Sequence, residues 1–351
     1  MPDAPRVLLV VANGGHGGMQ VQVGLLAGGL RARGCVVAVA AGPGDLDTAG
    51  ASVERLSEMS ARSAPRVVLE LRGVVRRFAP DVVHGHGLRL APMLAAVARK
   101  RALVTCHGLD PARVRATSLA TRLSRVAVAS CGEGPRRLLA ERGVVSRVLD
   151  NAVPVMPAPV ARDELLARFG LPASMALAVS PARLTEQKDP LTLVRALAAA
   201  KGVCGLLVGG GPLDGAIRAE VARLGAEDRI VIAPWQPDAR ALLAGADLLV
   251  LASRWEGQPT VVLEAMAAGV AVVATSCPGI ADTVVDGRSA LLAAPGDHAA
   301  LAAQLERAAS DPGLRRSLVD LARTQANRHR VEVVVEEHLD AYARLREGRW
   351  P

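Results

Sequence analysis

Short runs of valine, leucine and alanine alternate along this chain with longer segments in which apolar residues recur every three or four positions. The short runs have the length and composition of buried strands, and the longer segments have the period of helices that cover a sheet. Strands and helices that alternate in this way are typical of βα units with parallel sheets. The sequence therefore predicts an α/β protein.

We predict a set of strands in each half of the chain. In the first half these strands are 7–12, 35–41, 82–84, 102–106, 126–129 and 147–149. In the second half they are 176–179, 205–208, 230–232, 247–251, 271–274 and 290–292. Between the halves, Pro154, Pro157 and Pro159 exclude a continuous helix and favour an extended linker. The last segment, 331–349, has the pattern of one amphipathic helix.

Length and composition exclude several classes of protein. The chain has 351 residues, half of them hydrophobic, which suggests about two domains. No apolar run reaches the roughly 18 residues of a membrane helix, and residues 1–6 lack the basic-then-apolar order of a signal peptide. The five scattered cysteines form no Cys-x-x-Cys pair, which favours a reducing, cytoplasmic location and argues against structural zinc.

The net charge is +8, and nearly all of the positive charge is arginine. Aromatic residues that could stack on bases are almost absent, so nucleic acid is not expected as a partner. The charge suits an anionic ligand such as a nucleotide diphosphate. Peripheral contact with an anionic membrane is a variant of this interpretation, because an amphipathic helix in one basic region could meet anionic lipid. These residues are Arg55, Arg62, Arg66, Arg72, Arg76 and Arg77.

Two glutamates eight positions apart stand between the predicted strands 247–251 and 271–274. Glu256 lies in a turn, and Glu264 lies in a short apolar helix that ends at Gly269. The free N–H groups at the start of this helix are expected to point out of the carboxyl end of a parallel sheet, where a phosphate or a polyhydroxyl ligand can bind. Each carboxylate could accept hydrogen bonds from sugar hydroxyls. The alternative is a solvated helix with two surface glutamates, but the apolar neighbours of Glu264 leave it little solvated surface.

This strand–turn–helix–glycine–strand segment resembles the E-x7-E signature of retaining GT-B glycosyltransferases of the family-4 type (glycosyltransferase group 1). The resemblance is strongest over residues 176–296. It implies two Rossmann-like domains with parallel sheets that face a central cleft, an acceptor domain at 1–158 and a nucleotide-sugar donor domain at 159–330. It also implies that the C-terminal helix, within 331–351, packs back on the N-terminal domain.

The resemblance also implies roles in the second domain. Glu264 would accept the ribose hydroxyls of the donor. Glu256, with backbone N–H groups of Gly257, Thr260 and Val261, would hold the donor sugar. Two further loops are expected to face the same ligand. These are the glycine turn 209–211 and the loop around Trp235, where the resemblance implies contact with the nucleobase.

Arg183 and Lys188 flank the loop after the predicted strand 176–179. Asp189 followed by Pro190 predicts a helix start, with the aspartate as N-cap. Both cations therefore stand at the carboxyl edge of a sheet, where they could bind phosphate oxygens. The resemblance implies that they stabilise the departing diphosphate. No metal and no cofactor is expected, because no Asp-x-Asp follows a strand and two cations can replace a metal ion.

A glycine-rich loop, 13–18, follows the first predicted strand. Its glycines permit positive φ and a close approach of backbone to a ligand. A dinucleotide-binding fingerprint fits badly, because the glycine spacing is out of register with the helix and the second strand ends without an acidic residue. The resemblance implies that Gly17 and Gly18 let the donor diphosphate and sugar approach. A tight turn without a ligand is the alternative.

Three histidines follow strands of the first half. His84 and His86 lie on the same side of a strand end; a metal site is possible, but no third ligand is evident, and we favour a structural or acceptor-side role. His107 follows the predicted strand 102–106 at the carboxyl edge, where ligands of open α/β sheets bind. The resemblance implies that His107 faces the donor sugar. It could donate to a hydroxyl, or its backbone carbonyl could face the anomeric carbon.

The sequence therefore predicts a retaining, metal-independent hexosyltransferase. It would move a sugar from a nucleotide-diphosphate donor, for which we favour UDP, to a hydroxyl of a small-molecule, glycan or lipid acceptor. The resemblance implies front-face attack, with the leaving phosphate taking the acceptor proton. Two alternative hypotheses remain. The protein could be a sugar-nucleotide epimerase of the same fold or a non-catalytic nucleotide-sugar-binding protein. The sequence does not determine the sugar, the acceptor or the oligomeric state.

Overall fold

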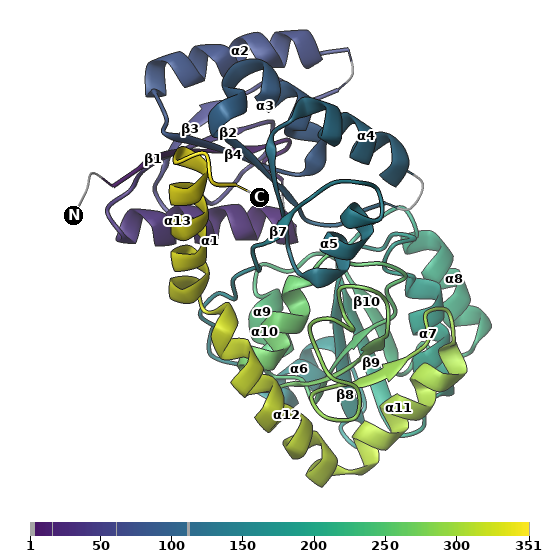
Figure 1. Cartoon of the computed structure of the whole chain (residues 1–351). Coiled ribbons are helices and arrows are strands. Elements are labelled where there is room, and N and C mark those ends of the chain that lie inside the picture. Colours follow the sequence, from purple (N-terminus) through teal and green to yellow (C-terminus); the bar gives the residue numbers. More distant parts are fainter. Residues whose placement is uncertain (1–3, 16, 61, 111–112, 351) are drawn as a thin grey trace. The chain divides into compact units, whose positions relative to one another are not determined.

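A computed structural model describes residues 4–15, 17–60, 62–110 and 113–350. The chain divides into two compact units, which Figure 1 shows with the course of the chain in colour. The first unit contains residues 1–152 and 328–351, and the second unit contains residues 153–327. Each division falls a few residues before the domain boundary expected from the sequence.

The first unit is built on a seven-stranded parallel sheet with the order β3-β2-β1-β4-β5-β6-β7. The chain runs from β1 outward to β3, and then from β4 outward in the opposite direction. The order of the strands therefore reverses between β1 and β4, which is where open α/β sheets bind ligands at their carboxyl edge. The strands are β1 (Arg6–Val11), β2 (Val36–Ala41), β3 (Ser52–Arg55), β4 (Val82–His86), β5 (Ala102–Cys106), β6 (Ala127–Ser130) and β7 (Arg147–Val148).

Helices cover both faces of this sheet. They are α1 (Gly18–Ala32), α2 (Ala64–Phe78), α3 (Ala91–Ala98), α4 (Val114–Ser124), α5 (Glu133–Ala140) and α13 (Val331–Arg346), with 3-10 turns η1 (Leu88–Leu90) and η2 (Arg99–Arg101). Alternate residues of β1 point to opposite faces of the sheet, as the pleat of a strand requires. Val7 and Leu9 pack in the core with α1 and α13, whereas Leu8 and Val10 pack in the core with α2 and α3.

Helix α13 completes the first unit, although it follows the whole second unit in the sequence. Its residues Val335 and Tyr342 are fully buried beside α1. A Cβ atom added at Gly29 of α1 would lie 2.4 Å from Cγ2 of Val335, so the two helices need a glycine at their contact. The hydroxyl of Tyr342 lies 2.8 Å from Nδ1 of His84 in β4. The C-terminal helix is therefore tied to the sheet by a polar contact as well as by packing.

The second unit is built on a six-stranded parallel sheet with the order β10-β9-β8-β11-β12-β13. Its order reverses between β8 and β11. The strands are β8 (Ala176–Pro181), β9 (Val203–Val208), β10 (Ile230–Ala233), β11 (Leu248–Leu251), β12 (Ala271–Thr275) and β13 (Leu291–Ala293). The helices are α6 (Arg162–Phe169), α7 (Pro190–Ala199), α8 (Asp214–Arg223), α9 (Ala239–Ala244), α10 (Thr260–Ala268), α11 (His298–Ser310) and α12 (Pro312–Ala326), and η3 (Asn327–His329) lies at the division of the units.

Helix ends in the second unit form where the sequence predicts them. Asp189 caps α7 by accepting hydrogen bonds from the backbone N–H (3.4 Å) and the hydroxyl (2.9 Å) of Thr192, and Pro190 stands at the first helical position. Gly269 closes α10 with φ +78°, in the left-handed region that favours glycine. Both the N-cap and the glycine stop are confirmed.

In the ranges described above, no helix is both long and apolar enough to cross a membrane. All five cysteines are buried and carry a free thiol.

Candidate functional site

Two loops meet at the reversal point of the second sheet. The loop after β8 carries Gln187 and Lys188, and the turn after β11 carries Arg254 and Glu256. The backbone N–H of Arg254 donates to the carbonyl of Gln187 at 2.8 Å. The side-chain amide of Gln187 donates in return to the carbonyl of Trp255 at 3.1 Å. These hydrogen bonds hold the two loops together at the edge where α/β sheets bind ligands.

The carboxylate of Glu256 lies at the centre of this junction. It forms an ion pair with Nζ of Lys188, and the hydroxyl of Ser253 donates to the same oxygen at 2.7 Å. Gln187 reaches the second oxygen at 3.4 Å. The side chains of Glu256 and Lys188 are only 6% and 16% exposed. A pair removed from water to this degree is costly to break, because either partner alone would be a buried charge.

A second ion pair supports the same junction. Nε of Arg254 donates to Oδ2 of Asp189 at 2.9 Å, and the Asp189 side chain is 5% exposed. Asp189 also caps α7, so its carboxylate serves the helix and the junction together. The sequence predicts Asp189 only as a helix cap, and it predicts no role for Gln187, Ser253 or Arg254. No local pattern marks them, because their partners lie on the other loop.

Arg183 differs from Lys188 in its surroundings. Its side chain is exposed, and within the described part of the chain it has neither a hydrogen bond nor an ion pair. The glycine turn after β9 packs against the same loop. A Cβ atom at Gly209 would lie 2.1 Å from the carbonyl oxygen of Ala182, and one at Gly211 would lie 2.4 Å from that of Leu184. These glycines therefore fix the loop from which Arg183 projects.

Glu264 is buried in α10 and pairs with a residue for which the sequence predicts no role. Nε of Arg240, in α9, donates to Oε1 of Glu264 at 2.8 Å. This bond leaves Oε2 as a possible acceptor for a ligand. Thr260 and Val261 form the first turn of the same helix, where backbone N–H groups have no partner inside the helix.

The residues that pack behind the turn with Glu256, here called the acidic turn, leave no room for further atoms. Gly279 has φ +90°, and a Cβ atom there would lie 2.2 Å from the carbonyl oxygen of Gly257. Cys277 is fully buried. Burial, and then the charge of Glu256, raise the pKa of the Cys277 thiol to about 12, so it is a neutral packing residue at neutral pH.

The glycine loop of the first unit uses its small residues for close packing. Gly18 begins α1 and Gly17 is its N-cap, with φ 164°, which is extended backbone open to any residue. None of the described glycines of this loop has left-handed φ, so the positive φ that glycine permits is not used there. Close packing requires small residues instead, because a Cβ atom at Gly14 would lie 2.9 Å from the carbonyl oxygen of Gly44. The left-handed residue is Gly44, with φ +126°.

His107 follows β5 at the carboxyl edge of the first sheet and is half-buried. Its Nε2 lies 3.0 Å from Nδ1 of His86. Burial lowers the pKa of His107 to about 4, with a smaller contribution from His338, while a hydrogen bond with the Asn151 side chain acts in the opposite direction. The ring is therefore neutral at pH 7.

His84 and His86 are buried in β4, and their rings lie on the same side of the strand, as the sequence predicts. Their ring centroids are 4.3 Å apart. His84 is held between the Tyr342 hydroxyl at 2.8 Å and the Thr105 hydroxyl at 2.7 Å. Burial lowers the pKa of both rings well below the ordinary value. Within the described ranges, no group of three or more His, Cys, Asp or Glu side chains is placed to hold a metal ion.

Two sequence families match consecutive parts of the chain. The family described as Glycosyltransferase Family 4 matches residues 16–176, and the one described as Glycosyl transferases group 1 matches residues 176–311. D-inositol 3-phosphate glycosyltransferase from Nocardiopsis dassonvillei is 29% identical over 305 residues, which are 75% of this chain and 70% of that protein. 2-Deoxystreptamine glucosyltransferase from Streptomyces kanamyceticus is 35% identical over 189 residues, 50% of this chain and 49% of that protein. The chain thus spans most of the first relative and about half of the second.

Solved structures share the arrangement of elements. Sucrose-phosphate synthase from Thermosynechococcus elongatus superposes with a TM-score of 0.85 over 98% of this chain and 100% of its own, at 19% identity. HepE from Anabaena, solved with UDP-glucose, gives a TM-score of 0.85 over 97% and 99% of the two chains, at 20% identity. At such identities the likeness establishes the fold.

The two parallel-sheet units and the likeness to these structures show that the chain has the GT-B fold. The fold class expected from the sequence is therefore confirmed. The chain belongs to the family-4, group-1 glycosyltransferases and is an enzyme of that kind.

Replacement of Gly279 by alanine should disturb the acidic turn. The new Cβ would clash with the Gly257 carbonyl, so we expect a loss of roughly 1–3 kcal/mol beyond the backbone cost of left-handed alanine. Gly287→Ala in the same unit is the matched control, because its φ is +69° and a Cβ there meets nothing within 4 Å. Urea unfolding of both variants measures the difference. Equal destabilisation of the two would show that the turn adapts freely.

Proposed function

We propose that this enzyme is a retaining, metal-independent hexosyltransferase that uses a UDP-linked sugar and transfers it to a hydroxyl group. The observation that carries the proposal is the buried Lys188–Glu256 pair at the reversal point of the second sheet. It places a cation and an anion together at the edge where such sheets bind ligands. HepE, which has the same fold, was solved with UDP-glucose, and this supports the choice of nucleotide.

The donor nucleotide would bind the second unit through α10. Glu264 keeps one carboxylate oxygen free of Arg240, and this oxygen would accept the ribose hydroxyls. Backbone N–H groups at Gly257, Thr260 and Val261 would bind oxygens of the donor sugar and phosphate.

The paired charges would act on neighbouring parts of the donor. Lys188 has three N–H donors, so it can contact a phosphate oxygen while it stays bonded to Glu256. Glu256 would accept hydroxyls of the donor sugar. Arg183, whose side chain is exposed, would supply a second cation. Negative charge grows on the diphosphate as the glycosidic bond breaks, and cations fixed in advance stabilise that charge.

The first unit would contribute Gly17, Gly18 and His107 to the sugar. Of the two expected roles for His107, its hydrogen bonds favour the backbone carbonyl. The ring already bonds to His86 and to the side chain of Asn151, which leaves no ring N–H for a sugar hydroxyl. We infer that the acceptor attacks from the face the diphosphate leaves, and that the leaving phosphate takes the acceptor proton, so that configuration is retained.

The acceptor would be a polyhydroxylated small molecule. Two relatives are named for cyclitol acceptors, inositol 3-phosphate and 2-deoxystreptamine. We therefore place cyclitols first among candidate acceptors, ahead of glycans and lipids.

A panel of nucleotide sugars tests the proposal. We expect one nucleotide diphosphate to raise the melting temperature, and its sugar conjugate to be hydrolysed slowly and transferred to a cyclitol, with or without magnesium. NMR of the product measures the anomeric configuration. An inverted product would exclude retention, and interconversion of donor sugars without an acceptor would indicate an epimerase. Binding without turnover would indicate a non-catalytic binding protein.

Removal of any one of three charges, the two of the pair or that of Arg183, should abolish most of the transfer. We expect Lys188→Ala, Glu256→Ala and Arg183→Ala each to lower kcat/KM by ~10²–10³, or roughly 2–4 kcal/mol of transition-state stabilisation. Glu264→Ala should mainly weaken nucleotide binding, measured by calorimetry with the nucleotide diphosphate.

Because Lys188 and Glu256 hold each other in place, their double variant should lose little more than either single variant. Additive losses would show that they act independently.

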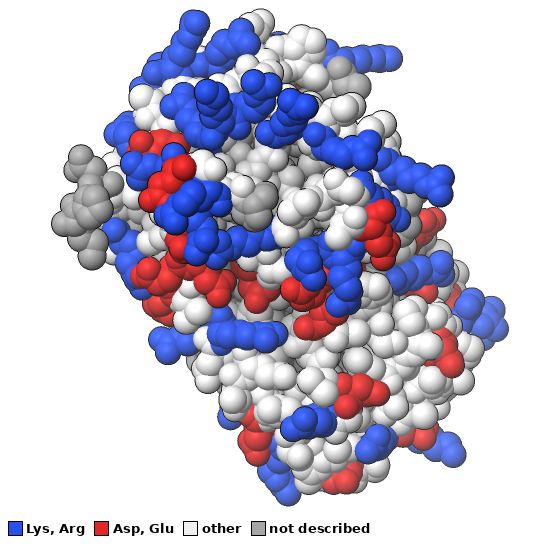
Figure 2. Space-filling model, viewed as in Figure 1, with Lys and Arg blue, Asp and Glu red and all other residues white. Residues whose placement is uncertain are grey.

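We further propose that the first unit contacts an anionic membrane surface. Between residues 62 and 125 the chain has thirteen basic and three acidic residues. Figure 2 shows basic side chains gathered over the region where Figure 1 labels α2, α3 and α4. Three leucines on α2 and α4, Leu69, Leu119 and Leu123, are 66%, 48% and 71% exposed. Exposed leucines among arginines suit the interface of an anionic bilayer, and five free buried thiols suit a cytoplasmic enzyme.

Vesicle binding at low salt tests this surface. Replacement of Arg76, Arg115 and Arg122 by glutamine should weaken binding to anionic vesicles by roughly 3 kcal/mol, about a hundredfold, at about 1 kcal/mol per charge. The control replaces three exposed arginines of the second unit, Arg288, Arg307 and Arg316, with the same change in net charge. Equal effects of the two triple variants, or no binding by the unaltered enzyme, would exclude this membrane contact.

A further inference from the structure

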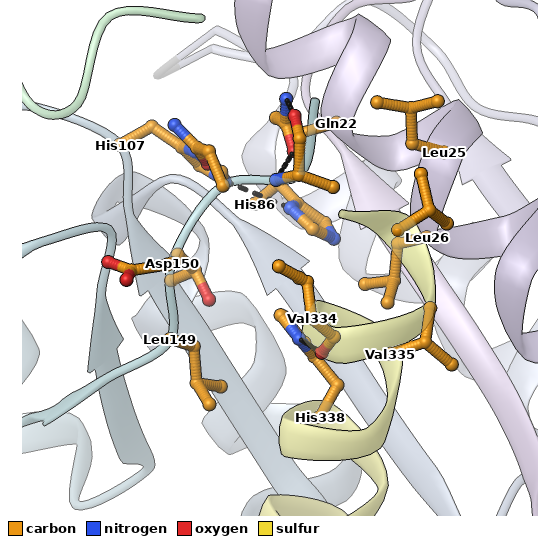
Figure 3. A pocket seen from close by; sticks show the side chains of 14 residues that line it. Gln22, Leu25, Leu26, His86, His107, Leu149, Asp150, Val334, Val335 and His338 are labelled. Carbon is orange, nitrogen blue, oxygen red and sulfur yellow. Dashed lines mark hydrogen bonds between the residues drawn. The ribbon is translucent and has the colours of Figure 1, made fainter. Parts of the chain in front are cut away.

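Four histidines gather inside the first unit, and only one of them belongs to the proposed donor site. His86 stacks on His107 with ring centroids 5.2 Å apart, and His84 lies 4.3 Å from His86 and 5.8 Å from His338 of α13. Figure 3 shows His86 joined to His107 by a hydrogen bond, beside the helix that carries Val334 and His338. Next to them is a small pocket that is lined by His86, His107 and His338. Residues of α1, α13 and the segment 149–152 form the rest of its wall.

The bond between His86 and His107 can have only one direction at a time. Burial makes both rings neutral at pH 7, so a single proton lies between Nδ1 of His86 and Nε2 of His107. The side chain of Asn151 also bonds to the His107 ring. An amide has both an acceptor oxygen and N–H donors, so this bond fits either tautomer of His107. The direction of the bond between the two rings therefore depends on His86.

The surroundings of the other nitrogen of His86 indicate that Nδ1 is the donor. Nε2 is buried and has no hydrogen-bond partner among the described residues. If Nδ1 carries the proton, Nε2 is an acceptor, and an under-satisfied buried acceptor is less rare in proteins than an unpaired N–H. The adjacent cavity has a volume of about 20 Å³ and is lined in part by Gln22, Val334 and His338. That is room for about one water molecule, which could donate to this nitrogen.

The backbone after His107 makes the ring's position important. Gly108 has φ +152°, near the edge of the region that favours glycine, and its carbonyl accepts the Cys106 thiol at 3.6 Å. The peptide group between His107 and Gly108 is therefore held on one side by this turn. On the other side it is held by the His107 ring, which is anchored to His86 and Asn151.

We propose that His86 is a positioning residue for the transfer reaction. It donates from Nδ1 to His107, fixes the His107 ring in one tautomer, and thereby aims the His107 carbonyl at the donor sugar. This inference rests on the proposed function, because it assumes that His107 faces the sugar. It adds a residue that does not touch the donor, and it links the reaction to a buried cluster completed by α13.

Three substitutions of His86 separate hydrogen bonding from packing. In His86→Asn the side-chain amide nitrogen takes the place of Nδ1, so the donor to His107 is kept. In His86→Gln the amide lies nearer the place of Nε2, and in His86→Phe no donor remains. We expect His86→Asn to keep kcat within a few-fold. His86→Gln and His86→Phe should lower kcat by roughly ten- to a hundredfold, as misplacement of a reacting group does, with KM for the donor little changed because the nucleotide binds the second unit.

The tautomer of His107 gives a readout that packing alone would not change. Nitrogen-15 NMR of the ring should show a proton on Nδ1 in the unaltered protein and in His86→Asn, and a mixed or reversed tautomer in the other two variants. His338→Asn is the matched control, because it removes a ring from the same cluster and leaves the bond between His86 and His107 intact. It should keep the tautomer of His107 and the value of kcat.

The outcomes distinguish this inference from the proposed function. If His86→Phe keeps both the tautomer and kcat, or if His86→Asn is as impaired as His86→Phe with an unchanged tautomer, His86 only packs and the inference fails. If the unaltered protein turns over no nucleotide sugar, the proposed function fails. The tautomer measurement needs no substrate, so it reports on the hydrogen bond in either case.

Discussion

The ion pair between Lys188 and Glu256 is the interaction on which the candidate site of the second unit depends. Each charge is nearly removed from water, and each stands on a different loop at the reversal point of the sheet. Either charge alone would be strongly unfavourable there, so the pair forces the two loops to meet. Ser253, Gln187, Arg254 and Asp189 then complete the junction. A site built in this way presents both signs of charge before any ligand arrives, and little reorganisation is needed when a diphosphate binds.

The two units support their candidate residues by different physical means. The second unit uses paired charges and glycines that pack against carbonyl oxygens. The first unit uses neutral rings: burial keeps His84, His86, His107 and His338 uncharged, and hydrogen bonds between rings and hydroxyls replace ion pairs. Neutral rings avoid the cost of buried charge, but they hold position only if each proton is on the correct nitrogen. Orientation in the first unit therefore depends on proton placement, whereas in the second unit it depends on charge pairing.

Most of the fold could be predicted from the sequence, because buried parallel strands are continuous apolar runs and their helices have a clear period. The exception among the strands is β3, whose residues Ser52–Arg55 are largely exposed and polar and so resemble a loop. The site was predicted only as separate residues. Lys188 and Glu256 are 68 positions apart, and nothing local shows that they bind each other. Arg240 could not be predicted for the same reason, because its partner Glu264 lies 24 positions away on another helix.

Helix α13 has a consequence for how the chain is made. The first unit contains the earliest strands of the sequence. Its core nevertheless includes Val335 and Tyr342, which follow the whole second unit. On the ribosome, domains generally fold as units as they emerge. The second unit is one continuous segment of the chain, so it can fold as soon as that segment has emerged. At that point the first unit still lacks α13, which covers part of its core. The half of the enzyme that is synthesised first is therefore the half that is finished last, and until α13 arrives its sheet must persist with an open apolar face.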